Sequence, residues 1–194
     1  MELKTVLQVA GVVLGLLYLL LEYKGSIWLW PVGLLMPLVH SLLFFKAGLY
    51  ADFGMEIYYV LAGLYGWVAW LWTARRGKAT GQAAQPFRPQ PTPKRLIPLL
   101  AAVYAVLHVA IYAFLRCCTD STVPFWDALT TALSIVAMWM LSKKYTGQWL
   151  VWLAVDAVTV GLYFYKEIPL TAGLYLLYCA MAVAGYRKWR KQLD

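Results

Sequence analysis

The chain carries little charge for its length. Only 13% of its 194 residues are Asp, Glu, Lys or Arg, whereas 62% are apolar or aromatic. Soluble globular domains contain about 25% charged and about 45–50% apolar residues. A chain with so few charged side chains cannot cover a water-exposed surface of this size, and its low polarity also excludes intrinsic disorder. The composition therefore predicts an integral membrane protein.

Residues that build metal, redox or catalytic sites are scarce. Three cysteines exclude a disulfide scaffold, and the two histidines lie in different apolar stretches with no partner at metal-ligand spacing. The sequence contains no HExxH motif, no phosphate-binding loop and no nucleophile–base pattern. These absences predict no catalytic residue, no metal and no cofactor, and they argue against an enzyme.

Seven apolar stretches follow one another, each near the ~20 residues with which a helix crosses the hydrocarbon core. They cover about 5–23, 27–45, 50–72, 95–115, 125–142, 147–165 and 168–186. The stretches are continuous rather than alternating, which excludes a transmembrane barrel. No small-residue cleavage site marks the first stretch as a signal peptide. We predict an all-α protein with seven transmembrane helices.

The basic residues are distributed unequally between the two ends of these helices. Thirteen of the 17 Lys and Arg residues fall on the side that holds residues 73–95 and the C-terminus, and four fall on the other side. The positive-inside rule then predicts an external N-terminus and a cytoplasmic C-terminus. The same distribution assigns the net charge of +8 to the lipid bilayer and not to a nucleic-acid partner.

A weak internal repeat surrounds the one long hydrophilic segment, residues 74–94, which is rich in proline and predicted to be a flexible linker. An offset of 119 aligns Gly54, Tyr59, Gly66 and Trp70 with Gly173, Tyr178, Gly185 and Trp189; offsets of 120 and 121 align Lys46 with Lys166 and Trp28 with Trp149. We predict two parallel three-helix repeats, 1–73 and 124–187, joined by a linking helix at 95–116 and followed by a tail at 188–194. Transporters with such a plan bind substrate near the midplane. Seven helices without duplication are the alternative.

Two carboxylates lie deep in the predicted spans. An acidic side chain at the centre of a membrane helix costs about 2.5–3.5 kcal/mol, so Asp156 and Glu56 are candidates for function. No lysine or arginine lies at comparable depth, which favours a cationic ligand or a transported proton. A protonated Asp156 that bonds between helices is the structural alternative. Glu22 and Asp127 lie nearer the span ends, where an interfacial position would also explain them.

Aromatic residues accompany these acids. Trp149, Trp152 and Asp156 are spaced i, i+3, i+7 and share one helical face. Two indoles and a carboxylate suit a flat, positively charged heterocycle. Tyr59 and Trp126 are weaker candidates for the same role. We interpret four other tryptophans as anchors at the membrane interface: Trp28, Trp30, Trp72 and Trp189.

Several segments resemble PnuC-type vitamin transporters over essentially the whole chain: Leu64–Trp67, Pro124–Asp127, Leu133–Met138, Lys144–Tyr145 and the pattern Trp149-x-x-Trp152-x-x-x-Asp156. The resemblance implies a three-plus-one-plus-three fold, like a full-length version of the SWEET sugar transporters. It implies facilitated diffusion of an unphosphorylated vitamin across the bacterial inner membrane, with trapping by a cytoplasmic kinase. It also implies a homotrimer, although nothing in the sequence shows the face that would form it.

Two departures from that family bear on the substrate. The nicotinamide riboside carriers it resembles have asparagine where this chain has Asp156 and glutamine where it has Glu56, and residues 21–28 and 46–54 look like the thiamine-transporting, PnuT-like branch. A carboxylate can pair with the thiazolium cation or accept from the aminopyrimidine. We therefore predict a thiamine transporter with a site formed by Asp156, Trp152, Trp149, Glu56, Tyr59 and Trp126. The alternatives are nicotinamide riboside or riboflavin on the same fold, a proton-coupled carrier, and a membrane-embedded enzyme or substrate-binding subunit.

Overall fold

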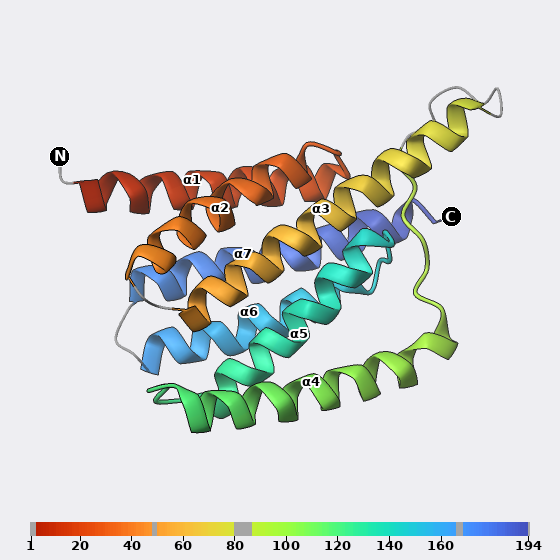
Figure 1. The fold of residues 1–194 in the computed structure, drawn as a ribbon. Helices are drawn as coiled ribbons and strands as arrows, with labels where there is room; N and C mark the ends of the chain where they lie inside the picture. Colours follow the sequence, from red (N-terminus) through yellow and green to blue (C-terminus); the bar gives the residue numbers. More distant parts are fainter. Residues whose placement is uncertain (1–2, 48–49, 80–86, 166–168, 194) are drawn as a thin grey trace. The chain divides into compact units, whose positions relative to one another are not determined.

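The computed structural model describes residues 3–47, 50–79, 87–165 and 169–193, and its described part is helical, without a strand element. Each of the seven predicted spans corresponds to one α-helix (Figure 1): α1 Leu3–Lys24, α2 Leu29–Ala47, α3 Tyr50–Ala79, α4 Ile97–Cys118, α5 Pro124–Ser142, α6 Gln148–Tyr165 and α7 Pro169–Lys191. A short 3₁₀ turn, η1 (Lys94–Leu96), precedes α4. The prediction of an all-α fold is confirmed for the described residues. Helices suit the hydrocarbon core of a membrane because every backbone N–H and C=O group can be hydrogen-bonded within the segment itself.

Four helical segments of the described chain are long and apolar enough to cross a membrane: Glu56–Arg75, Lys94–Cys118, Pro124–Ser142 and Gln148–Tyr165. Proline is present in the first turn of α4 and of α5, where no backbone donor is needed. Pro37 lies inside α2, yet the helix continues to Ala47. Neighbouring helices and local adjustment make such a proline tolerable in a membrane protein.

The chain divides into two compact units, Met1–Phe87 and Arg88–Asp194. In the first unit α2 packs between α1 and α3, and in the second each helix from α4 to α7 packs on the next one along the chain. The helices of each unit can be followed in Figure 1, from red to yellow and from green to blue.

The turn after α1 closes with a left-handed residue. Gly25 has φ 67°, its N–H donates to the carbonyl of Glu22 at 2.9 Å, and the N–H of Ser26 donates to the carbonyl of Leu21 at 2.8 Å. These two bonds are a Schellman motif, which satisfies carbonyls at the helix end. The ring of Phe87 lies against Gly25, where a Cβ would collide with it.

The turn after α5 has the same geometry. Lys144 has φ 59°, its N–H donates to the carbonyl of Leu141 at 2.8 Å, and the N–H of Tyr145 donates to the carbonyl of Met140 at 3.0 Å. Every residue of this second Schellman motif lies 119 positions after its counterpart in the first. The starts of α6 and α7 likewise lie 119 positions after those of α2 and α3.

Tryptophan packing repeats with the same offset. Trp30 meets Trp70 edge-on at 5.5 Å, and Trp149 meets Trp189 edge-on at 5.4 Å. In each pair the earlier indole covers a glycine one turn before the later one, so that a Cβ on Gly66 or Gly185 would collide with it.

This geometry corrects two interpretations of the sequence. The alignment of Trp28 with Trp149 at offset 121 is wrong, because Trp30 takes the equivalent position at 119. Trp30 and Trp189 are not interface anchors: they are 1% and 0% exposed, whereas Trp28 is 66% exposed. A buried indole and an interfacial indole look alike in a sequence because both follow an apolar stretch. The expected match of Lys46 with Lys166 involves a residue outside the described ranges.

The segment predicted as a linker, 74–94, is partly ordered. Helix α3 continues to Ala79, so the first residues of the segment are helical. After Phe87 the chain is hydrogen-bonded to the α5–α6 turn. The N–H of Gln90 donates to the carbonyl of Lys144 at 2.8 Å, and the N–H of Thr146 donates to the carbonyl of Gln90 at 2.9 Å. The N–H of Gly147 also donates to the Thr92 hydroxyl at 3.0 Å. Residues 80–86 lie outside the described ranges.

Candidate functional site

Asp156 is the buried carboxylate of the second unit. It lies in the middle of α6 and is 7% exposed. Helix α7 packs on α6 and brings Tyr178 and Cys179 close enough to interact electrostatically with the carboxylate. Among the described residues no donor is hydrogen-bonded to it and no cation pairs with it. A buried carboxylate in this state is suited to accept a hydrogen bond or a positive charge from a ligand.

Trp152 lies one turn before Asp156 on the same face of α6. Its ring is half-buried, and its Nε1–H is fully buried without an acceptor in the described part of the chain. Indole N–H groups usually find a partner when buried. Trp152 therefore supplies an aromatic surface and an unused donor next to an unused acceptor.

Trp149 occupies a different environment from the one that its spacing suggests. Its ring is 1% exposed, and it is enclosed by Trp189 and by the backbone at Gly185. A ligand ring cannot stack on an indole whose faces are already covered. The predicted stacking role is therefore not available to Trp149 in this conformation, and its packing makes it part of the α6–α7 contact.

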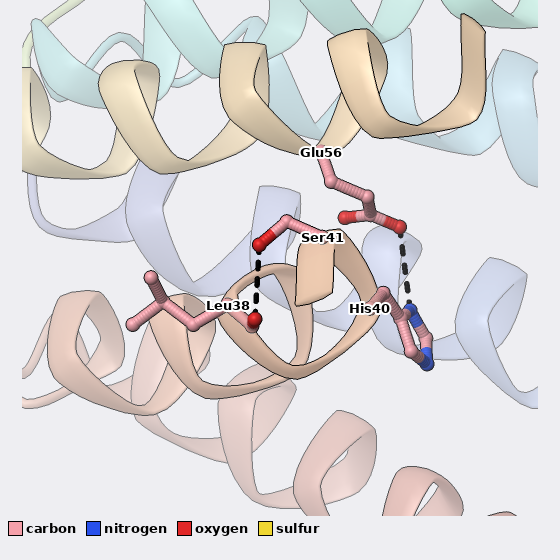
Figure 2. Close-up of polar contacts among 4 residues, drawn as sticks. All are labelled: Leu38, His40, Ser41 and Glu56. Atoms are coloured by element: carbon pink, nitrogen blue, oxygen red, sulfur yellow. Dashed lines mark hydrogen bonds and ion pairs between the residues drawn. The ribbon is translucent and has the colours of Figure 1, made fainter. Parts of the chain in front are cut away.

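Glu56 belongs to the first unit, where α3 packs against α2. His40 Nδ1 lies 3.3 Å from Glu56 Oε1, and both side chains are partly exposed (Figure 2). Since an ionised carboxylate only accepts, the histidine donates in this pair. The neighbouring Ser41 hydroxyl is turned inward to the carbonyl of Leu38 at 2.9 Å.

His40 was not among the candidates expected from the sequence, because no second histidine lies at metal-ligand spacing from it. A usable signal was present: His40 and Glu56 lie the same number of residues before and after position 48, within the connection between two predicted antiparallel spans. Residues equally far from such a turn lie at similar depth. Among the described residues, no group of three His, Cys, Asp or Glu side chains could hold a metal ion.

The weaker candidates lie in aromatic contacts. Tyr59 is edge-on to Tyr58 at 5.5 Å in α3, and Trp126 is edge-on to Phe125 at 5.3 Å in the first turn of α5, with its ring exposed. Two further acidic residues, which lie near the ends of the predicted spans, can also be placed in the structure. Glu22, in the last turn of α1, is 1% exposed and so is covered by the first unit, and Asp127 accepts a 2.6 Å hydrogen bond from Ser121.

Known proteins resemble the chain along nearly its whole length. Residues 5–191 match a family described as nicotinamide mononucleotide transporter. The riboflavin/roseoflavin transporter RibM of Streptomyces davaonensis is 31% identical over 92% of this chain and 82% of its own length. The nicotinamide riboside transporter PnuC of Escherichia coli is 25% identical over 94% of this chain and 84% of its own length. The nicotinamide riboside transporter PnuC of Neisseria mucosa is 26% identical over 92% of this chain and 70% of its own length.

A solved structure has the same fold. The crystal structure of the vitamin B3 transporter PnuC superposes with a TM-score of 0.70 at 24% identity, and the match covers 94% of this chain and 79% of that one.

Proposed function

Because the chain belongs to the nicotinamide mononucleotide transporter family, we propose that it carries nicotinamide riboside across the bacterial inner membrane. Membership of this family makes the chain a multi-pass membrane transporter of a vitamin, not an enzyme. Nicotinamide riboside is named for two of the relatives compared above and riboflavin for the third. None of these names supports the thiamine specificity expected from the sequence.

The observation that carries the proposal is that Asp156 and Trp152 lie one turn apart on the same face of α6. A buried carboxylate without a cationic partner among the described residues favours a positively charged ligand, and a half-buried indole beside it favours a flat aromatic one. The pyridinium ring of nicotinamide riboside has both properties. Riboflavin is aromatic but neutral, so the carboxylate gives it no charge pairing.

Thiamine is the second candidate, and the same residue favours it. Its thiazolium ring is also a flat cation, and its aminopyrimidine donates hydrogen bonds that a carboxylate accepts. The carboxylate Glu56 in the first unit adds to this argument, because the nicotinamide riboside carriers resembled by the sequence have an amide there.

The mechanism follows from the internal repeat. The Schellman turns and the Trp–Gly–Trp packing that recur at an offset of 119 support two three-helix repeats, α1–α3 and α5–α7, with α4 as the linking helix. Equivalent helices lie four positions apart along the chain, an even number, so the repeats run in the same sense, with the N-terminus outside. Transport proceeds by movement of one repeat relative to the other.

Two further predictions follow from the family resemblance. They are facilitated diffusion with trapping by a cytoplasmic kinase, and assembly as a homotrimer.

Calorimetric titration of the detergent-purified protein distinguishes the candidates. The titrants are nicotinamide riboside, thiamine and riboflavin. The variants are Asp156→Ala and, as a matched control, Asp120→Ala at an exposed position. We expect binding of nicotinamide riboside that Asp156→Ala weakens about tenfold, the scale of one charge-assisted hydrogen bond, and that Asp120→Ala leaves unchanged.

Selective binding of thiamine would replace the proposed substrate and retain the role of Asp156. Vitamin binding that Asp156→Ala does not weaken would overturn that role. Silence with all three vitamins would overturn the proposal as a whole.

A further inference from the structure

A groove of the second unit lies apart from Asp156, at the end of the helices where the linker joins α4 and where α7 ends. Its volume is about 760 Å³. It is bounded by the first turns of α4, the last turns of α5 and α7, and the α5–α6 turn. The proposed vitamin site, Asp156 and Trp152, uses none of the residues that line this groove.

The lining of this groove is mainly apolar, with two basic side chains. Ile97 and Leu100 of α4, Leu133 of α5 and Leu150 of α6 contribute the apolar surface, and Lys94 and Arg190 contribute the charges. A second hollow of about 460 Å³ shares Leu150, Tyr186 and Arg190 with the first and adds Arg187 and Lys191. We refer to both hollows together as the basic groove.

The charges of the basic groove are not neutralised within the described part of the chain. No acidic side chain lines either hollow, and none of the four lysines and arginines makes an ion pair with a described carboxylate. The helix beside the groove, α4, has no buried residue and exposes apolar side chains along its length. A ligand that fits must be anionic at one end and apolar over the rest.

We propose that the basic groove binds an anionic phospholipid of the cytoplasmic leaflet. The headgroup phosphate lies between Lys94 and Arg190, and an acyl chain lies along the apolar side chains of α4 and α5. Basic pockets between membrane helices on the cytoplasmic side recognise anionic headgroups in this way. The choice of the cytoplasmic leaflet rests on the orientation given under the proposed function. The charge and the lining of the groove are independent of that orientation.

Native mass spectrometry of the delipidated full chain tests the proposal. Phosphatidylglycerol and phosphatidylcholine with identical acyl chains are titrated separately, and bound lipid is counted. We expect tighter binding of phosphatidylglycerol and a loss of about fivefold in Arg190→Gln, the effect of one basic residue near an anionic lipid. The matched control Arg75→Gln removes an exposed charge of α3 that does not line the groove, and it should leave affinity unchanged.

A second pair of variants separates a lipid from a free anion. Ala101→Phe fills the groove from α4, whereas Ala102→Phe adds the same bulk at a neighbouring exposed residue outside the lining. For a lipid, only Ala101→Phe weakens binding and inorganic phosphate does not compete. Equal binding of both lipids, equal effects of Arg190→Gln and Arg75→Gln, or competition by phosphate would each overturn the proposal. Vitamin binding is measured separately on the same protein, so either proposal can fail alone.

Discussion

Three residues that share one face of α6 have three different surroundings. Trp149 is enclosed by packing, Trp152 has a buried donor without an acceptor among the described residues, and Asp156 is a buried carboxylate beside α7. Their spacing correctly predicts the common face but not these differences. The position of α7 decides them, because Gly185 admits the indole of Trp149 where a larger residue would exclude it.

The pair formed by His40 and Glu56 predicts a difference between two substitutions of the histidine. In His40→Gln an amide donor can still reach the carboxylate, whereas His40→Phe removes the donor and keeps a ring. We expect His40→Phe to weaken vitamin affinity about three- to tenfold, the range of one net hydrogen bond, and His40→Gln to retain most of it. Calorimetric titration and an uptake assay in vesicles measure this. Equal losses in both variants would mean that the ring, and not its hydrogen bond, matters.

Two glycines of α7 provide a matched test of the Trp149 packing. A Cβ on Gly185 would lie 2.6 Å from Trp149, whereas one on Gly173 meets nothing within 4 Å. Gly185→Ala should destabilise the protein by about 1–3 kcal/mol through overpacking. Gly173→Ala should be neutral or stabilising by about 0.5–1 kcal/mol, because helical glycine is unfavourable. Thermal unfolding in detergent, followed by tryptophan fluorescence, compares them. A similar fall in Tm for both would contradict the packing.

At the scale of elements, the two Schellman turns share their geometry although different residues occupy the left-handed position. The turn after α1 has Gly25 there and the turn after α5 has Lys144. A non-glycine residue in this conformation is strained, and burial also lowers the pKa of Lys144 below its ordinary value. The second turn therefore bears a cost that the first one avoids.

Lys144→Gly should stabilise the protein by up to about 1 kcal/mol by relieving the backbone strain. The lowered pKa means that the charged lysine is disfavoured in the fold. This additional cost is present at pH 7 and disappears as the pH rises to the unfolded value of about 10.4. The gain of Lys144→Gly should therefore shrink between pH 7 and pH 10.5, measured by thermal unfolding.

The control for this substitution is Lys143→Gly. Lys143 has φ −87°, which any residue adopts, so glycine there relieves no backbone strain. It adds freedom to the unfolded chain and removes the ammonium that lies 6.0 Å from the centroid of the Trp139 ring, and both effects should lower stability. A gain in both variants would show that loss of charge, and not the left-handed backbone, is responsible.

At the scale of the whole molecule, the repeats share packing residues but not polar ones. At the offset of 119 the position of Asp156 corresponds to Pro37, and that of Glu56 corresponds to Tyr175. The residues that hold helices together are duplicated because both units must pack in the same way. The carboxylates are single, so the repeat of packing residues does not extend to the acidic positions.

The predicted orientation can be tested with cysteines that the chain already has. Cys117 and Cys118 are exposed at the end of α4, the end that the distribution of basic residues assigns to the outside. A membrane-impermeant maleimide should label them in intact cells. After both are changed to serine, Gln192→Cys in the C-terminal segment should react only once the cells are permeabilised. Labelling of Gln192→Cys in intact cells would invert the topology.

The sequence by itself determined that the chain is a helical membrane protein, where its helices lie and which family it resembles. These properties depend on local composition and on apolar length, which each segment carries on its own. Even the repeat was readable at Gly66, Trp70, Gly185 and Trp189, although Trp30 was missed as the partner.

Only the tertiary structure decided which polar and aromatic side chains are accessible. It enclosed Trp149, buried Glu22 and joined His40 to Glu56. The physical reason is that the burial and pairing of a side chain depend on which residues of the neighbouring helix lie opposite it. The turns between the helices determine which residues these are. Those turns lie many residues away from the side chains concerned, and no local pattern in the sequence contains that information.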